Sequence, residues 1–518
     1  MCSLAEGPPP PADGCITVCE ENGDLVTIHA SNAPVNYTPR IAGFEYPSIS
    51  TSTETLCSLA TDEAAQSAFQ PHVDEVSLWK QAWYTCRVHG VTEMLDELSK
   101  NDSAPWPITM LACGCRNTVT WANSFRGSLY PHLMLSPDEM INEFSAAKDW
   151  EESEIRAFAW HQHTNKCAVA WKDNTVKIFI SGSDVVPTLK HRHQRGVSCL
   201  AWKPLSATVL AVGCHGCILI WHIDPNSQST RPTASAAQVL SHNGHAPITC
   251  LSWDPRGRLL VSSSPSDTAI LVWDVPREAC VPLRRAGGGG VALLRYSPDS
   301  SKLFASSPSQ VFRVWETRTW TCEKWTQLSG RCQSACWSPD GRFLLFCTEN
   351  EPAIFALNFI HSGSKTGGAE SAIKCADVSE LAIDCDGQET RVGGLIQDMV
   401  WDNSGERLAV LFKGNPETGN AGDLIALFNT RLTPTLQLIP SGFVRGEPGE
   451  VPELISFKPN FNRGALLTIC WHSGKVTFIP LLFIPSSTMA ENGAIPAHFT
   501  QKSTPLPQEL FSVSNSNK

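Results

Sequence analysis

The sequence has few charged residues, and their balance is acidic. Of its 518 residues, 18% are Asp, Glu, Lys or Arg, which is below the roughly 25% of an average domain. The net charge of −11 argues against a general nucleic-acid-binding protein, because such proteins carry a basic excess or a basic face. With 42% hydrophobic residues, the chain has enough apolar side chains for a large core, so wholesale disorder is excluded.

Segments that would send the chain to or across a membrane are also missing. The start, MCSLAEGPPPPADG, has neither a basic region nor an apolar run of the secretory kind. The longest apolar run, from Val476 to Ile484, contains Pro480 and is much shorter than the roughly 20 residues of a spanning helix. We therefore expect a soluble protein of the cytosol or nucleus, where the 20 cysteines remain thiols.

Signatures of catalysis and of metal or phosphate binding are absent. The sequence has no G-x-x-x-x-G-K-[ST] loop, no H-E-x-x-H and no G-x-S-x-G. The four glycines at 287–290 precede a strand and predict a loop, and His161 and His163 are expected on a surface turn. Cys214 and Cys217 have C-x-x-C spacing without a second pair nearby, whereas zinc needs four ligands. We therefore expect no metal, no cofactor and no enzymatic activity.

Seven copies of one repeat fill most of the chain. Each copy has an apolar run ending in an aromatic residue, a polar turn, a second apolar run, a tight turn and a third run. The aromatic residues recur at separations of 42, 51, 43, 41, 64 and 56 residues, and they are Trp160, Trp202, Trp253, Tyr296, Trp337, Trp401 and Phe457. The shorter separations match the roughly 40–45-residue period of WD40 blades. The sequence thus predicts an all-β fold, a seven-bladed WD40-type β-propeller over residues 151–484.

The third copy contains the residues of a WD40 hydrogen-bond network. His245, Asp267 and Trp273 stand at the spacing of the loop His, turn Asp and strand Trp of that network. Ser263 is expected to supply the strand hydroxyl, with Ser262 as the alternative. A buried indole N–H needs an acceptor, and a chain of such bonds makes a blade rigid. We therefore interpret these residues as structural and not catalytic.

One loop of the predicted propeller is densely basic. Lys190, His191, Arg192, His193 and Arg195 lie within six residues of one another, in the segment that leads into the second blade. Clustered basic residues favour an acidic partner. The loop is a candidate partner-binding site for a peptide, for acidic lipid or for a nuclear-import receptor, and the alternative is a solvated loop.

Outside the propeller, four segments differ in character. Residues 1–30 predict a hairpin around an Asn-Gly turn, which we expect to latch the last blade. Residues 31–68 predict a mobile connector, and residues 69–150 a small helical block packed beside or under the propeller. Ser136, Pro137 and Glu139 form a strong helix start within that block. Residues 485–518 predict a disordered tail.

Several longer stretches resemble the aladin family of WD-repeat nucleoporins. They are FAWHQHTNKCAVAW from Phe158, LKHRHQRGVSCLAWKPLSATVLAVGCHGCILIW from Leu189, LSGRCQSACWSPDGRFLLF from Leu328, VWDNSGERLAVL from Val400 and RGSLYPHLMLSPDEMINEF from Arg126. The resemblance runs from Met1 to about Phe483 and fades in residues 31–68 and in the tail. It implies a non-enzymatic scaffold or adaptor of the nuclear pore complex that supports nucleocytoplasmic transport.

The same resemblance implies particular partners. They are a transmembrane nucleoporin that anchors the protein at the nuclear envelope, other pore-complex proteins, and spindle proteins in mitosis. The sequence has no Phe-Gly dipeptide, so we do not expect it to form part of the permeability barrier.

Two other classes of function stay open. Propellers that serve as substrate receptors of cullin ubiquitin ligases carry Trp-Asp-x-Arg at the end of a third strand, and Trp315-Glu316-Thr317-Arg318 differs from that motif at one position. A propeller enzyme would need acids or metal ligands converging on the central channel, and the sequence shows no such set.

Overall fold

The computed structural model describes residues 2–32, 46–47, 49, 110, 114–115, 128–224, 229–285, 289–359, 371–385, 388–461 and 463–483. Nearly all of the predicted connector, residues 69–109 of the predicted helical block, and the tail from residue 485 lie outside the described residues. Within the described ranges, no helix has the length and apolar character needed to cross a membrane.

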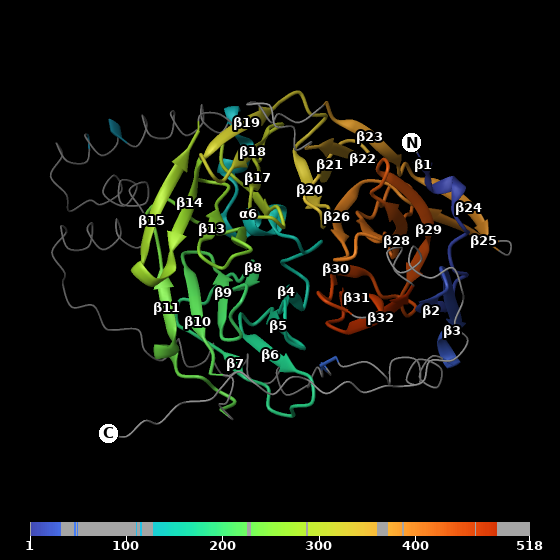
Figure 1. The fold of residues 1–518 in the computed structure, drawn as a ribbon, viewed down its shortest axis with the longest axis horizontal. Helices are drawn as coiled ribbons and strands as arrows, with labels where there is room; N and C mark the ends of the chain where they lie inside the picture. Colours follow the sequence, from blue (N-terminus) through green and yellow to red (C-terminus); the bar gives the residue numbers. More distant parts are fainter. Residues whose placement is uncertain are drawn as a thin grey trace, which may run out of the picture. The chain divides into compact units, whose positions relative to one another are not determined.

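Seven sheets form the blades of a propeller, and they are arranged around a central axis (Figure 1). Blade one contains, from the inner to the outer strand, β4 (Ile155–Trp160), β5 (Lys166–Trp171), β6 (Val176–Ile180) and β7 (Thr188–Leu189). Blade two contains β8 (Cys199–Trp202), β9 (Val209–Gly213), β10 (Ile218–His222) and β11 (Ala237–Leu240). Blade three contains β12 (Cys250–Trp253), β13 (Leu260–Ser263), β14 (Ala269–Asp274) and β15 (Ala279–Arg284).

Blades four to seven follow the same antiparallel order. Blade four contains β16 (Leu293–Tyr296), β17 (Lys302–Ser306), β18 (Phe312–Glu316) and β19 (Thr321–Trp325), and blade five contains β20 (Cys332–Trp337), β21 (Phe343–Thr348), β22 (Ala353–Asn358) and β23 (Ile373–Asp377). Blade six contains β26 (Ile396–Trp401), β27 (Arg407–Phe412), β28 (Leu424–Arg431) and β29 (Gln437–Arg445). Blade seven contains β30 (Pro452–Phe457), β31 (Gly464–Trp471) and β32 (Val476–Leu482).

The repeated aromatic residues mark the ends of the inner strands. Each inner strand contacts the inner strand of the next blade, and β30 contacts β4, so the ring is closed. Three of the tryptophans also connect neighbouring blades by donating their indole N–H to a backbone oxygen of the preceding inner strand: Trp202 to Ala159 (3.2 Å), Trp253 to Ala201 (3.1 Å) and Trp337 to Arg295 (3.1 Å). The fold is the seven-bladed β-propeller predicted from the sequence.

The N-terminal segment runs along the outer edges of three blades (Figure 1). β1 (Cys2–Ser3) pairs in parallel with β23 of blade five. β2 (Cys15–Glu21) and β3 (Asp24–His29) form a hairpin, and β2 pairs in parallel with β32 of blade seven. Glu20, a residue of β2, forms an ion pair with Arg407 of blade six, and both side chains are buried. With β2 as its fourth strand and β3 outside β2, blade seven is a five-stranded sheet.

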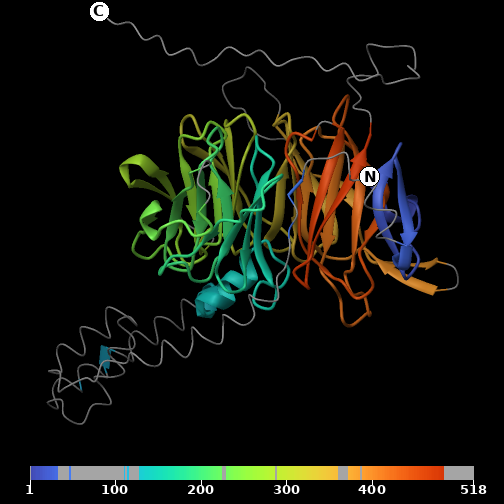
Figure 2. The ribbon, with the colours of Figure 1, turned by 90° about the horizontal axis from the view of Figure 1, so that it is seen from below.

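A short helix lies on one face of the ring. α6 (Pro137–Phe144) follows η3 (Pro131–Met134) and has a capping box, in which Glu139 N donates to Ser136 Oγ (3.3 Å) and Ser136 N donates to Glu139 Oε2 (2.6 Å). It lies against the strand ends on one side of the propeller, here termed the α6 face (Figure 2). The helix start at Ser136 is the one that the sequence predicted.

One two-stranded element was not predicted. β24 (Leu381–Cys385) and β25 (Gln388–Val392) form a separate hairpin between blades five and six. Together with the insertion before β23, this hairpin accounts for the separation of 64 residues between Trp337 and Trp401. The other 3-10 helices within the described ranges are η1 (Leu4–Glu6), η2 (Ala30–Asn32), η4 (Ala234–Ala236) and η5 (Val275–Arg277).

Candidate functional site

The network in blade three is continuous and buried. Trp273 Nε1 donates to Ser262 Oγ (2.9 Å), Ser262 Oγ lies 3.0 Å from His245 Nε2, and His245 Nδ1 lies 3.0 Å from Asp267 Oδ2. One direction of donation satisfies every atom: the Ser262 hydroxyl donates to Nε2, and the Nδ1 hydrogen donates to the carboxylate. The four residues thus connect the loop before blade three to its second and third strands.

The structure corrects the identity of the serine. The Ser263 hydroxyl, which the sequence favoured, donates instead to the backbone oxygens of Ala292 (3.3 Å) and Cys250 (3.5 Å). The reason is the pleat of the strand, in which neighbouring side chains point to opposite faces. Leu260 is paired directly with Trp273, so Ser262, two residues further on, shares the face of the tryptophan and Ser263 does not.

The hydrogen bonds of the network act on the ionisation of Asp267. Burial would raise the pKa of this carboxyl group, but the hydrogen bonds from His245 and from the Ala269 amide lower the pKa below its ordinary value of 3.8. The carboxylate is therefore charged at neutral pH. Because all its strong contacts are inside the blade, it acts as a fixed acceptor for the histidine.

Other blades keep only parts of this network. In blade two, Trp221 Nε1 donates to Gln194 Oε1 (3.3 Å), so a loop amide accepts directly from the indole, as the Ser262 hydroxyl does in blade three. In blade four, Trp315 Nε1 is buried without a hydrogen-bond partner among the described residues. Blade three is therefore held by a longer chain of side-chain hydrogen bonds than these two blades.

The segment around α6 contacts all seven blades. From blade one to blade seven, the contacts are Arg156 over the Trp150 ring (3.9 Å), Trp150 Nε1 to Val197 O (2.8 Å), Ser266 Oγ to Met140 Sδ (3.4 Å), His132 Nε2 to Gly289 O (3.1 Å), Arg331 to Glu143 (2.6 Å), Gln397 Nε2 to Ala147 O (3.5 Å) and Asp149 N to Glu453 Oε2 (2.9 Å). Residues 131–150, here termed the α6 cap, thus lie across the ends of the inner strands.

A small cavity lies beneath the α6 cap. It has a volume of about 30 Å³ and is lined by Phe144, Arg295, Ser334 and Asp398, among others. Burial raises the pKa of Asp398, although the Arg295 charge and a hydrogen bond from Ser334 (2.6 Å) oppose that rise. A cavity of this size holds a water molecule or two.

The basic loop lies on the α6 face as well. Lys190, Arg192, His193 and Arg195 are exposed, and His191 is half-buried. The loop connects β7 to β8, and His215 N, in the turn after β9, donates to the Arg195 backbone oxygen (2.9 Å). The loop is therefore fixed against blade two and its charged groups face outward.

Two motifs singled out in the sequence are structural in the fold. Cys214 and Cys217 flank the turn between β9 and β10 and are both buried. His161 was expected on a surface turn, but it is buried, with its ring 5.2 Å from that of Trp202 and its Nε2 atom 3.0 Å from Ser206 O. Among the described residues, no group of three or more His, Cys, Asp or Glu could hold a metal ion.

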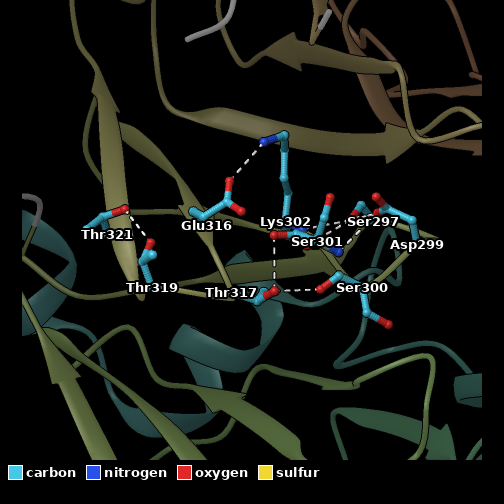
Figure 3. Close-up of polar contacts among 9 residues, drawn as sticks. All are labelled: Ser297, Asp299, Ser300, Ser301, Lys302, Glu316, Thr317, Thr319 and Thr321. Carbon is cyan, nitrogen blue, oxygen red and sulfur yellow. Dashed lines mark hydrogen bonds and ion pairs between the residues drawn. The ribbon is translucent and has the colours of Figure 1, made fainter. Parts of the chain in front are cut away.

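The segment that resembles the ligase motif lies at the end of β18 (Figure 3). Glu316 Oε2 accepts from Lys302 Nζ (3.3 Å), and Thr317 Oγ1 donates to Ser300 O (2.6 Å). Both middle residues of the motif are thus engaged inside blade four, while Arg318 is exposed.

Seven sheets around one axis, a closed ring of inner strands and the blade-three network define a seven-bladed propeller of the WD40 type. The family model described as the Aladin seven-bladed propeller matches residues 136–482. The chain is also 33% identical over 358 residues to Aladin of Arabidopsis thaliana, covering 64% of this chain and 77% of that relative. The chain therefore belongs to the aladin family, as its resemblance indicated, and the match begins at the cap residue of α6.

More distant similarities concern parts of the chain. It is 23% identical over 257 residues to transducin beta-like protein 3 of Rattus norvegicus, which is 49% of this chain and 29% of that relative. A chain in the crystal structure of the mitotic checkpoint complex superposes with a TM-score of 0.47 and 17% identity, covering 63% of this chain and 86% of that one.

Proposed function

We propose that this protein is a non-enzymatic scaffold or adaptor subunit of the nuclear pore complex that supports nucleocytoplasmic transport. The observation that carries the proposal is membership of the aladin family over residues 136–482. A rigid propeller suits such a role, because its loops and edges offer several separate surfaces on one frame.

The proposal includes an anchor at the nuclear envelope. A transmembrane nucleoporin would hold the propeller at the pore membrane, and other pore-complex proteins would contact its remaining surfaces. In mitosis, the same surfaces would be available to spindle proteins. Each of these partners is inferred from the aladin family.

The test is localisation of the full-length tagged protein. We expect signal at the nuclear rim, and we expect it to become diffuse when the transmembrane nucleoporin is depleted. Diffuse signal in cells that contain the anchor would contradict the proposal. Spindle-pole signal in dividing cells would separately test the mitotic role.

The cullin-ligase alternative has its own readout. It requires co-purification with a cullin adaptor that is lost in Arg318→Ala, because Arg318 is the exposed basic residue of the motif-like segment. Rim localisation that persists in Arg318→Ala, without adaptor in the purified complex, favours the pore-complex role.

A further inference from the structure

A groove opens on the α6 face beside the α6 cap. It has a volume of about 590 Å³ and lies between the start of α6, blade one and the loops of blade two. Its charged lining residues are Asp138, Glu151, Arg156, Lys172 and Arg195, together with His215. The volume falls within the roughly 300–1,000 Å³ of typical ligand sites.

Arg156 forms the wall of the groove on the side of blade one. Its guanidinium stacks on the Trp150 ring at 3.9 Å, and its Nη1 atom donates to Asn174 Oδ1 (3.3 Å). Its Nε atom is buried without a hydrogen-bond partner in the described part of the chain. The side chain is therefore held in place by the stack while one of its donors is unused.

Arg195 and His215 form the opposite side. Within the described ranges, neither side chain has a hydrogen-bond or ion-pair partner. Their backbones are joined by the bond from His215 N to Arg195 O (2.9 Å). Gly196, at φ +56°, lets the loop pass close to Ile141 of α6. An unpaired guanidinium is thus presented from a loop whose backbone is fixed.

The charges of the groove are mixed, with cations in excess. Arg156, Lys172 and Arg195 face the groove together with Asp138 and Glu151, and Lys190 and Arg192 lie on the same loop as Arg195. A carboxylate would pair with the guanidinium fork of Arg195 in the bidentate geometry that Arg favours. The Asp138 and Glu151 carboxylates can accept hydrogen bonds from peptide amides, which a phosphate backbone does not offer.

We propose that this groove binds an acidic peptide segment of a partner protein, with a peptide carboxylate paired to Arg195. The site goes beyond a scaffold role in general, because it assigns a partner chemistry to one surface. It also holds wherever in the cell the protein is located, so its test is independent of localisation. Because surface ion pairs are screened by salt, the affinity falls as ionic strength rises.

The experiment measures the fluorescence anisotropy of a labelled decapeptide of alternating Glu and Ser, titrated with the full-length protein at low salt. A decapeptide of alternating Gln and Ser controls for charge. Arg195→Glu should weaken binding by more than about tenfold, as expected for loss of one partner of a charge pair. Arg192→Glu is the matched control, because it removes the same charge from the same loop outside the groove, and should weaken binding less than about threefold.

Several results would overturn the proposal. One is absence of saturable binding up to about 1 mM, the weak end of specific affinities. Equal loss in Arg195→Glu and Arg192→Glu would indicate diffuse attraction by the loop, without a groove. Tighter binding of phosphatidylserine vesicles or of a DNA duplex, lost in Arg195→Glu, would assign the site to a polyanion. Arg195→Gln, with its thermal melting compared with the wild type, guards against a folding defect in the charge-reversed variant.

Discussion

At the scale of single residues, Ser262 serves two buried side-chain partners at once. Its hydroxyl accepts from the Trp273 indole and lies within hydrogen-bond distance of His245, and all three side chains are buried. Ser262→Ala should destabilise the protein by about 2–3 kcal/mol, because a buried donor and a buried ring nitrogen lose their partner together. Ser263→Ala is the matched control: its hydroxyl serves backbone oxygens only, and about 1 kcal/mol is expected. Denaturant unfolding compares the two, and equal losses would contradict the network.

The sequence located this network only to within one residue. Spacing along the chain identified His245, Asp267 and Trp273, because loop, turn and strand positions recur in every WD40 blade. It could not choose between Ser262 and Ser263, since the choice depends on which face of β13 carries each side chain. That face is set by the pairing of Leu260 with Trp273, which is a property of the sheet.

Lys166 carries a second prediction at this scale. It is 7% exposed, lies 4.6 Å from the Trp202 ring centroid and donates to the Ala207 backbone oxygen. Burial lowers the pKa of Lys166 from 10.5 to about 8. The unfolded chain therefore binds more protons between pH 8 and 10.5, and this lysine makes stability rise with pH across that interval.

Lys166→Met should remove this dependence. At pH 7 the variant should be more stable than the wild type by about 2 kcal/mol, because an uncharged side chain of similar length avoids the cost of a buried charge. The difference should shrink as pH rises from 8 to 10. Lys177→Met, on the next strand and less buried, should leave the pH slope unchanged. Melting temperatures measured from pH 7 to 10 test this, and a parallel pH profile in Lys166→Met would contradict it.

At the scale of elements, the α6 cap contacts every blade, and the helix itself contributes the contacts of Met140 with blade three and of Glu143 with blade five. Eight residues form α6, which is too few for a stable helix in isolation, so its capping box and its contacts with the propeller must hold it. Ser136→Ala removes the cap acceptor and should cost about 1 kcal/mol. Ser145→Ala, at the other end, should be neutral or slightly stabilising, since the Ser145 hydroxyl is buried without a partner among the described residues. Hydrogen exchange of residues 137–144 reports both; faster exchange in Ser145→Ala alone would contradict the assignment.

Elements with a local signal were predicted well. The inner strands end at the aromatic residues that the repeat identified, and α6 begins at the expected serine. The β24–β25 hairpin was missed because it lies in an insertion and has no counterpart in the other copies. Six of the seven contacts of the α6 cap were not predictable either, since each joins residues at least 47 positions apart in the chain and depends on the closed ring.

At the scale of the whole molecule, the N-terminal segment connects three blades that belong to the far end of the chain. Leu4 is 1% exposed within the core shared by blades five and six. Arg445 pairs with Asp13, and Thr17 Oγ1 accepts from Arg445 N (3.1 Å). The sequence predicted one latch on blade seven, whereas the structure shows contacts with blades five, six and seven. A ring without this segment would leave the outer edge of β32 unpaired.

Removal of residues 1–30 should therefore lower the melting temperature sharply, because blade seven would lose its fourth strand and Arg407 its counter-charge.

Glu20→Gln isolates the loss of the counter-charge of Arg407. The Glu20 carboxylate accepts from Arg407 Nε at 3.0 and 3.2 Å in a fully buried site, and loss of one partner of a buried pair costs about 3 kcal/mol or more. Glu21→Gln, one residue further and exposed, should change stability by less than about 0.5 kcal/mol. Unfolding followed at one scan rate should rank the proteins as wild type and Glu21→Gln, then Glu20→Gln, then the truncated chain. If the truncated chain melts with the wild type, the N-terminal segment does not stabilise the ring. If only the two glutamate variants coincide, the buried ion pair contributes nothing and strand pairing alone accounts for the stabilisation.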